Sequence, residues 1–297
     1  MKNIYLGTYP RSGSTLLGMM LGAHSQICHI GESSYWARVK PEETRCCCGT
    51  IGCETLLHIK AEILKSSNPL APLHVYYACI MLDVQEKVLG ATGELRDVTF
   101  DKLGFKNINE ALDACLGALD LVATVARQIT RKKIIVENLK YPQIAEALLK
   151  KYANWWSVVI VRDPRGVALS TKKEGEKRGS PNPIKDQIFD LLTLAKRINV
   201  LIQKPKTIFV RYEDLCHEPS QVLEKICDFI GIPFETKMLQ FKQHKGHLLM
   251  GNQMMHDNNE IIREDLRWHT ELSEEEKSFF LQVNFVEAYQ QLGYSLN

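Results

Sequence analysis

Residues 4–17 read IYLGTYPRSGSTLL and decide the class of fold. The apolar run at 4–8 predicts a strand, Pro10 and Gly13 mark a turn, and the apolar residues that follow Thr15 predict a buried helix. Where a strand passes through such a turn into a helix, backbone N–H groups and the helix N-terminus converge on a phosphate-like anion. The stretch therefore predicts an α/β fold with an anion-binding loop after its first strand.

The loop differs from the phosphate loop of ATPases. That motif needs Gly-Lys-Ser/Thr, where the lysine reaches the terminal phosphates and the hydroxyl holds magnesium. Here Ser14 stands at the lysine position, and the cation is Arg11 inside the loop. A guanidinium binds an oxyanion bidentately and stays charged, so we expect an anion site without a mandatory metal. A serine-capped helix beside a surface arginine is the alternative, because capping alone explains serines at a helix start.

The rest of the chain repeats the pattern of strand and helix. Apolar runs predict strands at 134–136, 157–161 and 207–210, and helices are predicted at 142–151, from 167 onward and around 222–230. Such alternation implies a parallel sheet with right-handed crossovers and helices on its faces. Ligands bind outside the carboxyl ends of such strands. Arg11, Arg162 and Arg211 are therefore expected to gather along one rim.

Other segments complete the predicted organisation. Residues 54–130 are mostly helical in pattern, and the stretches 175–186 and 244–269 are polar or irregular. A C-terminal helix is predicted at 274–292, where Ser273 and Glu276 are spaced as a capping box. We expect one domain over residues 1–297, with the helical segment at about 54–130 as an insertion and residues 244–297 as a closing loop and helix.

The composition excludes several classes of protein. The 297 residues are 45% hydrophobic and carry a formal charge of +2, which excludes a disordered chain and a broad basic surface for nucleic acid. The N-terminus lacks the apolar stretch of roughly 7–15 residues that a secretory signal needs. No apolar run approaches the roughly 18–20 residues that span a bilayer. We expect a cytoplasmic protein without a nucleic-acid partner or a membrane span, and its oligomeric state stays open.

Nine cysteines exclude a complete disulfide framework because the number is odd. Five scattered cysteines are expected to be small core residues. They are Cys28, Cys79, Cys115, Cys216 and Cys227. The other four cluster in residues 46–53, CCCGTIGC. A zinc ribbon normally uses a second pair of ligands far away in the chain, and that second pair is missing here. We expect a structural loop there and assign no metal; a disulfide and a metal site are the open alternatives.

Three segments resemble the sulfotransferases that use 3′-phosphoadenosine 5′-phosphosulfate (PAPS). Residues 10–17, PRSGSTLL, are similar to the loop that holds the 5′-phosphosulfate in that family. Residues 161–170, VRDPRGVALS, resemble the second signature, in which the first arginine and a serine eight residues later hold the 3′-phosphate. Residues 210–215, VRYEDL, look like the segment after the next strand, whose tyrosine often lies near the nucleotide. The match looks closer to the tyrosylprotein and carbohydrate branches than to the cytosolic phenol enzymes, whose loop typically carries a lysine.

The resemblance implies a fold, a cofactor and a set of binding residues. The fold is the three-layer α/β fold of the P-loop nucleotide-kinase type, and the cofactor is PAPS, with adenosine 3′,5′-bisphosphate (PAP) as product. The implied cofactor-binding residues are Arg11, Ser12, Gly13, Ser14, Thr15, Arg162, Ser170, Tyr212, Lys245 and Arg263. Asn252 and Trp268 are further candidates for closing over the adenosine.

Sulfuryl transfer to a hydroxyl needs a base for the acceptor's proton and a cation for the oxygen that is released. Glu32 is the candidate base, because it follows the apolar run 27–30 and resembles, by its interval after the loop, the catalytic glutamate of the tyrosylprotein branch. A solvated surface carboxylate is its alternative reading, and His24 and His29 are rival bases. Arg11 and Lys140 are the candidate cations; Lys140 precedes Pro142 much as a family lysine does.

The sequence thus predicts a PAPS-dependent sulfotransferase that acts in line on a hydroxyl of a sugar, a phenol or tyrosine, or a small natural product. The alternatives are a P-loop nucleotide kinase or NTPase and a non-catalytic nucleotide-binding protein. The acceptor pocket is expected from loops such as 33–60, 66–100 and 175–186. Tyr35 and Trp36 would suit a ring-bearing acceptor or the core.

Overall fold

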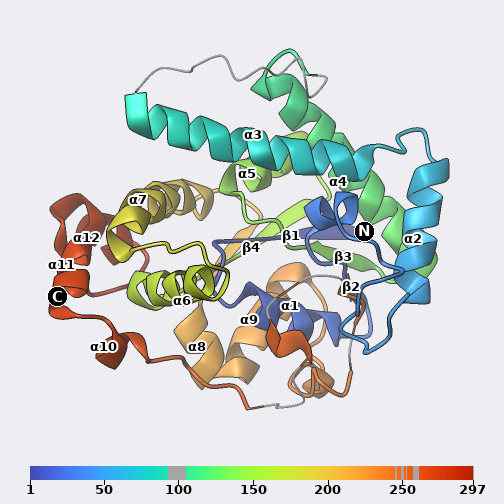
Figure 1. Cartoon of the computed structure of the whole chain (residues 1–297). Coiled ribbons are helices and arrows are strands. Elements are labelled where there is room, and N and C mark those ends of the chain that lie inside the picture. The colour runs from blue at the N-terminus through green and yellow to red at the C-terminus, as the bar shows by residue number, and fades with distance from the viewer. Residues whose placement is uncertain (93–104, 245, 249–250, 252, 257–260, 297) are drawn as a thin grey trace.

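Five parallel strands form a central sheet in the order β2–β3–β1–β4–β5 (Figure 1). The computed structural model describes all residues except 93–104, 245, 249–250, 252, 257–260 and 297. The strands are β1 (Lys2–Thr8), β2 (Ile27–His29), β3 (Ile134–Glu137), β4 (Trp155–Val161) and β5 (Thr207–Arg211). The parallel α/β sheet predicted from the alternating pattern is confirmed.

The central position of β1 follows from its residues. Six of its seven residues are buried, as expected for a parallel strand covered on both faces. β1 pairs with β3 in the register Lys2↔Ile134 and with β4 in the register Leu6↔Val158. The chain returns on one side of β1 through β2 and β3, and on the other through β4 and β5. The order of strands therefore reverses beside β1, and sheets of this kind bind ligands at that point.

Helices cover both faces of the sheet (Figure 1). α1 (Ser14–Gly22) packs against β1 and β2, and α8 (Tyr212–His217) and α9 (Pro219–Ile230) pack against β5. On the other face, α5 (Pro142–Lys151) packs against β1 and β4, and α7 (Ile184–Leu201) packs on α5. α6 (Pro164–Lys177) follows β4 and contacts α7. The three predicted layers are thus present.

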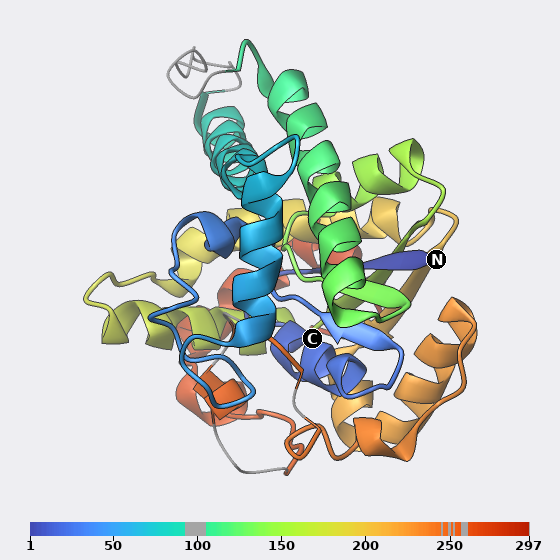
Figure 2. The same cartoon turned by 90° about the vertical axis from the view of Figure 1, so that its right-hand side faces the viewer.

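The described residues of the segment 54–130 are mostly helical, as predicted. The helices are α2 (Glu54–Lys65), α3 (Ala71–Thr92) and α4 (Ile108–Thr130), and Figure 2 shows them side by side. α4 packs against both α2 and α3 and reaches β2 and β3 with its apolar face. The short 3₁₀ helix η1 (Ser33–Ala37) packs against α3. The helical segment is thus joined to the chain that follows β2.

Helix boundaries differ from the prediction where polar residues begin or break a helix. α6 begins at Pro164 rather than Val167, because Asp163 caps it by accepting a hydrogen bond from the Arg165 N–H and proline fits the first turn. The stretch 175–186 shrinks to the residues between α6 and α7. α7 was not predicted, although its apolar residues recur at the spacing of three to four that is typical of a helix. The short α8 follows β5 directly, where the pattern predicts no helix.

The C-terminal helix expected at 274–292 is wrong as one element. The chain forms α11 (Glu274–Ser278), η5 (Phe279–Leu281) and α12 (Val283–Gln290), with α10 (Trp268–Glu271) before them. The capping box of Ser273 and Glu276 is confirmed, and the N-terminus of α11 depends on it. Two further 3₁₀ helices, η3 (Thr236–Met238) and η4 (Gln253–His256), lie between α9 and α10.

The five cysteines scattered along the chain belong to the core. Cys28, Cys79, Cys115, Cys216 and Cys227 are buried, as predicted for small core residues. Across the described residues, we find no helix whose length and hydropathy would let it cross a membrane. The single-domain organisation stays a prediction.

Candidate functional site

A cavity of about 1060 Å³ lies at the carboxyl ends of the strands. All five strands contribute to its wall a residue that lies beyond their last residue. These residues are Arg11 after β1, Glu32 after β2, Lys140 after β3, Arg162 after β4 and Tyr212 after β5. The volume is at the upper end of the range of about 300–1000 Å³ found for small-molecule sites. The cavity is therefore the candidate binding and reaction site.

The loop after β1 leaves the N-terminus of α1 open to the cavity. The cap residue is Gly13, with φ of 93°, and no side chain caps the helix. A Cβ atom on Gly13 would lie 2.4 Å from the ring of Tyr212, so only glycine lets this ring rest on the loop. The first N–H groups of a helix have no partners within it. Because no serine side chain caps α1, the alternative of a serine-capped helix is wrong.

Some of the other loop residues line the cavity, and others are buried behind it. Ser14 and Thr15 line the cavity, whereas Ser12 is buried and lies outside the lining. Arg11 has a left-handed backbone with φ of 72°, which is costly for a residue with a Cβ. Its Nε donates to Ser170 Oγ at 2.8 Å, and Glu174 lies 3.9 Å away. Burial lowers the pKa of Arg11, and the charge of Glu174 opposes that shift.

Arg162 lies in the same part of the cavity as Arg11. Its guanidinium is buried, donates to the carbonyl oxygen of Arg11 at 3.3 Å and lies 4.8 Å from the ring centre of Tyr212. It also pairs with the carboxylate of Asp265 at 3.1 Å. Hydrogen bonds from Arg267, together with the charge of Arg162, hold the pKa of Asp265 well below its usual range. Arg11 and Arg162 thus meet on one rim, as predicted, and Ser170 lines the same cavity and bonds Arg11.

A glycine in α6 makes room for the guanidinium of Arg162. A Cβ atom on Gly166 would lie 2.9 Å from Nε and 3.0 Å from Nη2 of Arg162. The next arginine points elsewhere: Arg165 pairs with Asp163 at 2.7 Å and donates to the carbonyl oxygen of Ser295 at 3.1 Å. The two arginines of the motif therefore have different contacts: Arg162 lines the cavity, and Arg165 bonds the C-terminal residues.

Glu32 and Lys140 form an ion pair at the cavity wall. Glu32 is mostly buried at the start of η1, which removes the alternative of an open surface carboxylate. Lys140 comes from the loop between β3 and α5, so two neighbouring strand ends supply the pair. A carboxylate and an ammonium in contact offer a proton acceptor and a cation at one point.

A second carboxyl group, Glu137, lies directly behind this pair. It ends β3, is fully buried, and its Oε1 accepts the backbone N–H of Ser33 at 2.9 Å. Burial raises the pKa of Glu137 to about 8, and the charge of Glu32 adds to the shift. Glu137 does not line the cavity but positions the start of η1, and with it Glu32. Glu137 was not predicted, because an isolated glutamate at a strand end carries no motif.

Several other candidates lie elsewhere. Arg211 was expected on the rim, but its guanidinium lies over the Tyr294 ring at 4.5 Å and does not line the cavity, so that prediction is wrong. His24 and His29 are buried outside the lining, and burial lowers the pKa of His29 to about 4. Trp268 is buried beneath the guanidinium of Arg165 at 3.9 Å.

The C-terminal segment contributes partly as expected. Arg263 lines the cavity, and its carbonyl oxygen accepts the hydroxyl of Tyr212 at 3.2 Å. Lys245 and Asn252 lie outside the described residues. Asp265 and Arg267 also line the cavity and were not predicted. Their only signal was the alternation of charge in residues 263–267, REDLR.

Another part of the wall comes from η1, α3 and the segment after α6. Tyr35 lines it, while Trp36 belongs to the core. Tyr76 and Ile80 of α3 and Arg38 and Arg178 complete this part, and the Arg38 guanidinium lies 5.3 Å from the Tyr76 ring centre. All three loops expected to build an acceptor pocket therefore contribute to the cavity.

Comparisons with known proteins agree with this geometry. A family model described as "Sulfotransferase domain" matches residues 2–291. No curated protein sequence matches the chain. The chain is similar to the solved structure of the sulfotransferase domain from the curacin biosynthetic pathway, with 19% identity, a TM-score of 0.54 and coverage of 100% of this chain and 99% of the other.

Two further solved structures are similar. The sulfotransferase domain from the Synechococcus PCC 7002 olefin synthase is 19% identical, with a TM-score of 0.54 and coverage of 100% and 98% of the two chains. Mouse sulfotransferase SULT7A1, complexed with PAP, is 11% identical, with a TM-score of 0.51 and coverage of 99% and 89%. At these identities the likeness shows a shared fold.

Proposed function

The chain belongs to the sulfotransferase family, and from this premise we propose that it transfers the sulfuryl group of PAPS to a hydroxyl of an acceptor. The observation that carries the proposal is the set of groups that the strand ends bring into one cavity. An uncapped helix N-terminus and two arginines face it from one part, and a carboxylate–lysine pair faces it from another. PAPS is the sulfuryl donor, and its two anionic groups need two separate positive sites.

The residues present fit such a donor. Gly13, Ser14 and Thr15 present the N-terminus of α1, which favours the 5′-phosphosulfate. Arg162 and Ser170 would hold the 3′-phosphate, and the anion would take the place of the Asp265 carboxylate on the guanidinium. Tyr212 and Arg263 would lie beside the nucleotide. Lys245 stays a prediction from the resemblance.

Glu32 is the proposed general base and Lys140 a proposed cation of the reaction. A carboxylate that is mostly buried and lines the cavity can accept the proton of an acceptor hydroxyl as the hydroxyl attacks the sulfur in line. Lys140, already in contact with Glu32, can stabilise the negative charge on the oxygen that leaves the sulfur, and Arg11 can do the same from the loop. The protein supplies position and charge, as in phosphoryl transfer.

The acceptor class is proposed from the second part of the cavity wall. Tyr35 and Tyr76 offer ring faces, and Arg38 and Arg178 offer positive charge beside them. This wall suits a sugar, a phenol or tyrosine, or a small natural product with a ring. The closer likeness to the tyrosylprotein and carbohydrate branches and the cytoplasmic location stay predictions.

The decisive test is binding and turnover without added magnesium. In a buffer that contains neither magnesium nor a chelator, PAP should bind the chain in calorimetry, and labelled PAPS should pass its label to members of an acceptor library. Arg162→Ala should weaken PAP binding by about 10- to 100-fold, since a hydrogen bond to a charged group is worth about 1.5–3 kcal/mol. Arg211→Ala is the matched control, because that arginine lies at the end of the neighbouring strand β5 but does not line the cavity.

Two outcomes would decide against this function. Magnesium-dependent binding of ATP without binding of PAP would favour the nucleotide kinase or NTPase. Tight binding of PAP with no transfer to any acceptor class would favour a non-catalytic nucleotide-binding protein.

A further inference from the structure

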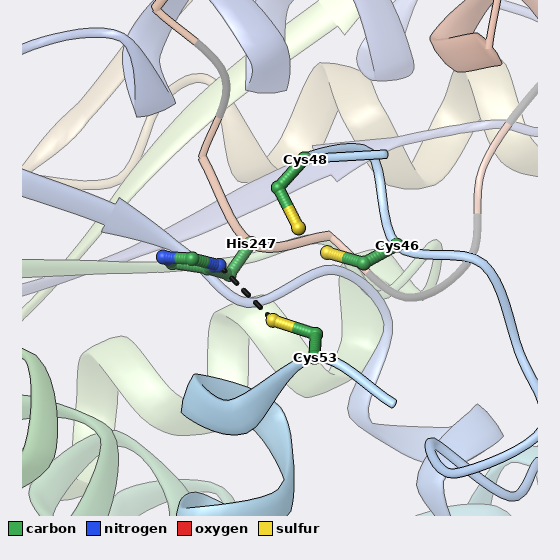
Figure 3. Close-up of side chains that lie close together, drawn as sticks. All are labelled: Cys46, Cys48, Cys53 and His247. Carbon is green, nitrogen blue, oxygen red and sulfur yellow. Dashed lines mark hydrogen bonds between the residues drawn. The ribbon is translucent and has the colours of Figure 1, made fainter. Parts of the chain in front are cut away.

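Three cysteines and a histidine converge at a point outside the cavity wall (Figure 3). The Sγ atoms of Cys46, Cys48 and Cys53 and a ring nitrogen of His247 all lie within 4.8 Å of one another. Cys53 and His247 are 194 residues apart in the chain. The loop 46–53 and the segment after α9 therefore meet through side chains that are all metal ligands by type.

We propose that Cys46, Cys48, Cys53 and His247 bind a structural zinc ion. Three thiolates and one imidazole form a closed set of four ligands, which is typical of structural zinc sites. A tetrahedral zinc ion with Zn–S bonds of about 2.3 Å separates its sulfur ligands by about 3.8 Å, so the four atoms need to contract by about 1 Å at most. Binding releases the thiol protons to solvent, because each cysteine binds as the thiolate.

The loop already holds its three cysteines in a suitable shape. The backbone N–H of Cys46 donates to the carbonyl oxygen of Thr50 at 2.9 Å, and its carbonyl oxygen accepts the N–H of Gly49 at 2.9 Å. These bonds close a tight turn between Cys46 and Cys48. Cys53 is the cap residue of α2, where the helix N-terminus favours a negatively charged thiolate.

The ring of His247 is oriented as a ligand. Its Nδ1 lies 3.2 Å from the Sγ of Cys53, and its Nε2 lies 3.3 Å from the hydroxyl oxygen of Thr55. Histidines that bind metals commonly donate their second ring N–H to a polar partner, which sets the orientation of the ring. The hydroxyl oxygen of Thr55 can accept the N–H of Nε2, and Nδ1 is then available to bind zinc.

The fourth cysteine of the loop has a different environment. The Sγ of Cys47 donates to the carbonyl oxygen of Gly246 at 3.1 Å and accepts the N–H of Leu248 at 3.2 Å. Its backbone N–H donates to the carbonyl oxygen of Leu248 at 3.0 Å. Cys47 thus holds the residues beside His247 without taking part in the cluster, which gives the proposal a control within the same loop.

The site would support the cavity without taking part in the chemistry. None of the four ligands lines the cavity, but residues that follow His247 do, among them Gly251, Met254 and Asp265. A zinc ion would join the start of this segment to the loop before α2, which is distant in the sequence. We expected a structural loop here because the distant second pair of ligands of a zinc ribbon was missing from the sequence. The fourth donor is instead a single histidine that folding brings close.

The test is the zinc content of the full chain purified without chelator. We expect about one zinc ion per chain by elemental mass spectrometry, and retention of that zinc in Cys47→Ser and in Cys227→Ser, a buried cysteine outside the loop. Cys48→Ser and His247→Ala should each lose most of it. Circular dichroism on every variant separates loss of metal from loss of fold.

Cobalt provides a second readout on the folded wild-type chain. Reconstitution with Co²⁺ should produce a sulfur-to-cobalt charge-transfer band and the intense visible bands of a tetrahedral site, and Cys48→Ser should remove them. The proposal is overturned if the folded wild-type chain binds neither zinc nor cobalt in stoichiometric amount. A disulfide within the loop of the native protein, or metal that depends on Cys47 and not on His247, would overturn it as well.

Discussion

Glu32 shows how one side chain depends on its neighbours for a chemical role. Its carboxylate contacts Lys140 in the cavity, and the backbone N–H of the next residue, Ser33, is held by Glu137. The ammonium of Lys140 lies against the carboxylate that is proposed to accept the proton. The role proposed for Glu32 therefore rests on the placement of two other residues.

Replacement of Glu32 by glutamine tests that role. Glu32→Gln keeps the size and one acceptor oxygen but removes the base, so kcat should fall by about 10²- to 10⁴-fold. PAP affinity should stay within about twofold, because the nucleotide is held by other residues. Initial rates with labelled PAPS and calorimetry with PAP measure the two quantities. Glu235→Gln is the control, since that carboxylate bonds Ser25 away from the cavity; an unchanged kcat in Glu32→Gln would remove the base from the mechanism.

At the scale of elements, the start of α6 sets the position of Arg162. The helix begins immediately after the β4 turn, and Gly166 in its first turn leaves the space that the guanidinium of Arg162 occupies. The motif at 161–170 thus places Arg162, at the end of β4, against Gly166, at the start of α6.

Gly166→Ala is expected to weaken PAP binding while the protein stays folded. The new Cβ atom would lie 2.9 Å from Arg162 Nε, so the guanidinium must move and PAP affinity should fall about tenfold. Gly117→Ala in α4 is the matched control, because its Cβ atom meets nothing within 4 Å. That control should raise the free energy of unfolding by about 0.5–1 kcal/mol and leave PAP binding unchanged. Equal PAP affinity in both variants would contradict this account of Gly166.

The contact between β3 and η1 predicts a pH dependence of stability. The folded-state pKa of Glu137 is about 8, against 4.5 for an ordinary glutamate, because its carboxyl group is buried. Between these values the folded chain keeps a proton that the unfolded chain releases. The contribution of Glu137 to the free energy of unfolding therefore falls as pH rises through this window, by up to about 1.4 kcal/mol per pH unit.

Urea unfolding at several pH values measures this contribution. The free energy of unfolding of Glu137→Gln should fall less steeply than that of wild type between about pH 5 and pH 8, because glutamine has no proton to lose. The exposed residue Glu43 provides the control, and Glu43→Gln should keep the wild-type slope. Parallel profiles for wild type and Glu137→Gln would show that burial does not raise the pKa of Glu137.

At the scale of the whole molecule, the C-terminal residues bind back to the centre of the sheet. The hydroxyl of Tyr294 lies 2.9 Å from the carbonyl oxygen of Val161 at the end of β4 and 2.7 Å from Glu213. Glu213 in turn accepts the N–H of Asp163 at 2.9 Å, in the turn that carries Arg162. The last residues of the chain therefore support the turn that lines the cavity.

Tyr294→Phe is expected to lower the free energy of unfolding by about 1–3 kcal/mol, because it leaves buried polar groups without this partner. Tyr289→Phe is the comparison: its hydroxyl makes a longer bond, 3.3 Å to the carbonyl oxygen of Leu191, and should cost less. Urea unfolding of both variants measures the difference. A smaller loss in Tyr294→Phe than in Tyr289→Phe would contradict the supporting role of the C-terminal residues.

The predictions from sequence succeeded where the signal is local. Strands such as 134–136 carry a continuous β-branched run, and the pattern of parallel strands follows from their alternation with helices. The long α7 was missed although its apolar residues recur at helical spacing. The breaks in the C-terminal helix were missed because tertiary packing rather than a local pattern sets them. Arg211 was placed wrongly because a position after a strand does not tell which way the side chain turns.

The sequence by itself determined the family, the parallel sheet and the loop after β1, because each depends on residues that are neighbours in the chain. Only the tertiary structure decided that Asp265 pairs with Arg162, that Glu137 lies behind Glu32, and that His247 meets the cysteine loop. These contacts join residues about 100–200 positions apart, and no spacing rule links such residues. The physical reason is that burial of one shared core, rather than local preference, brings these side chains together.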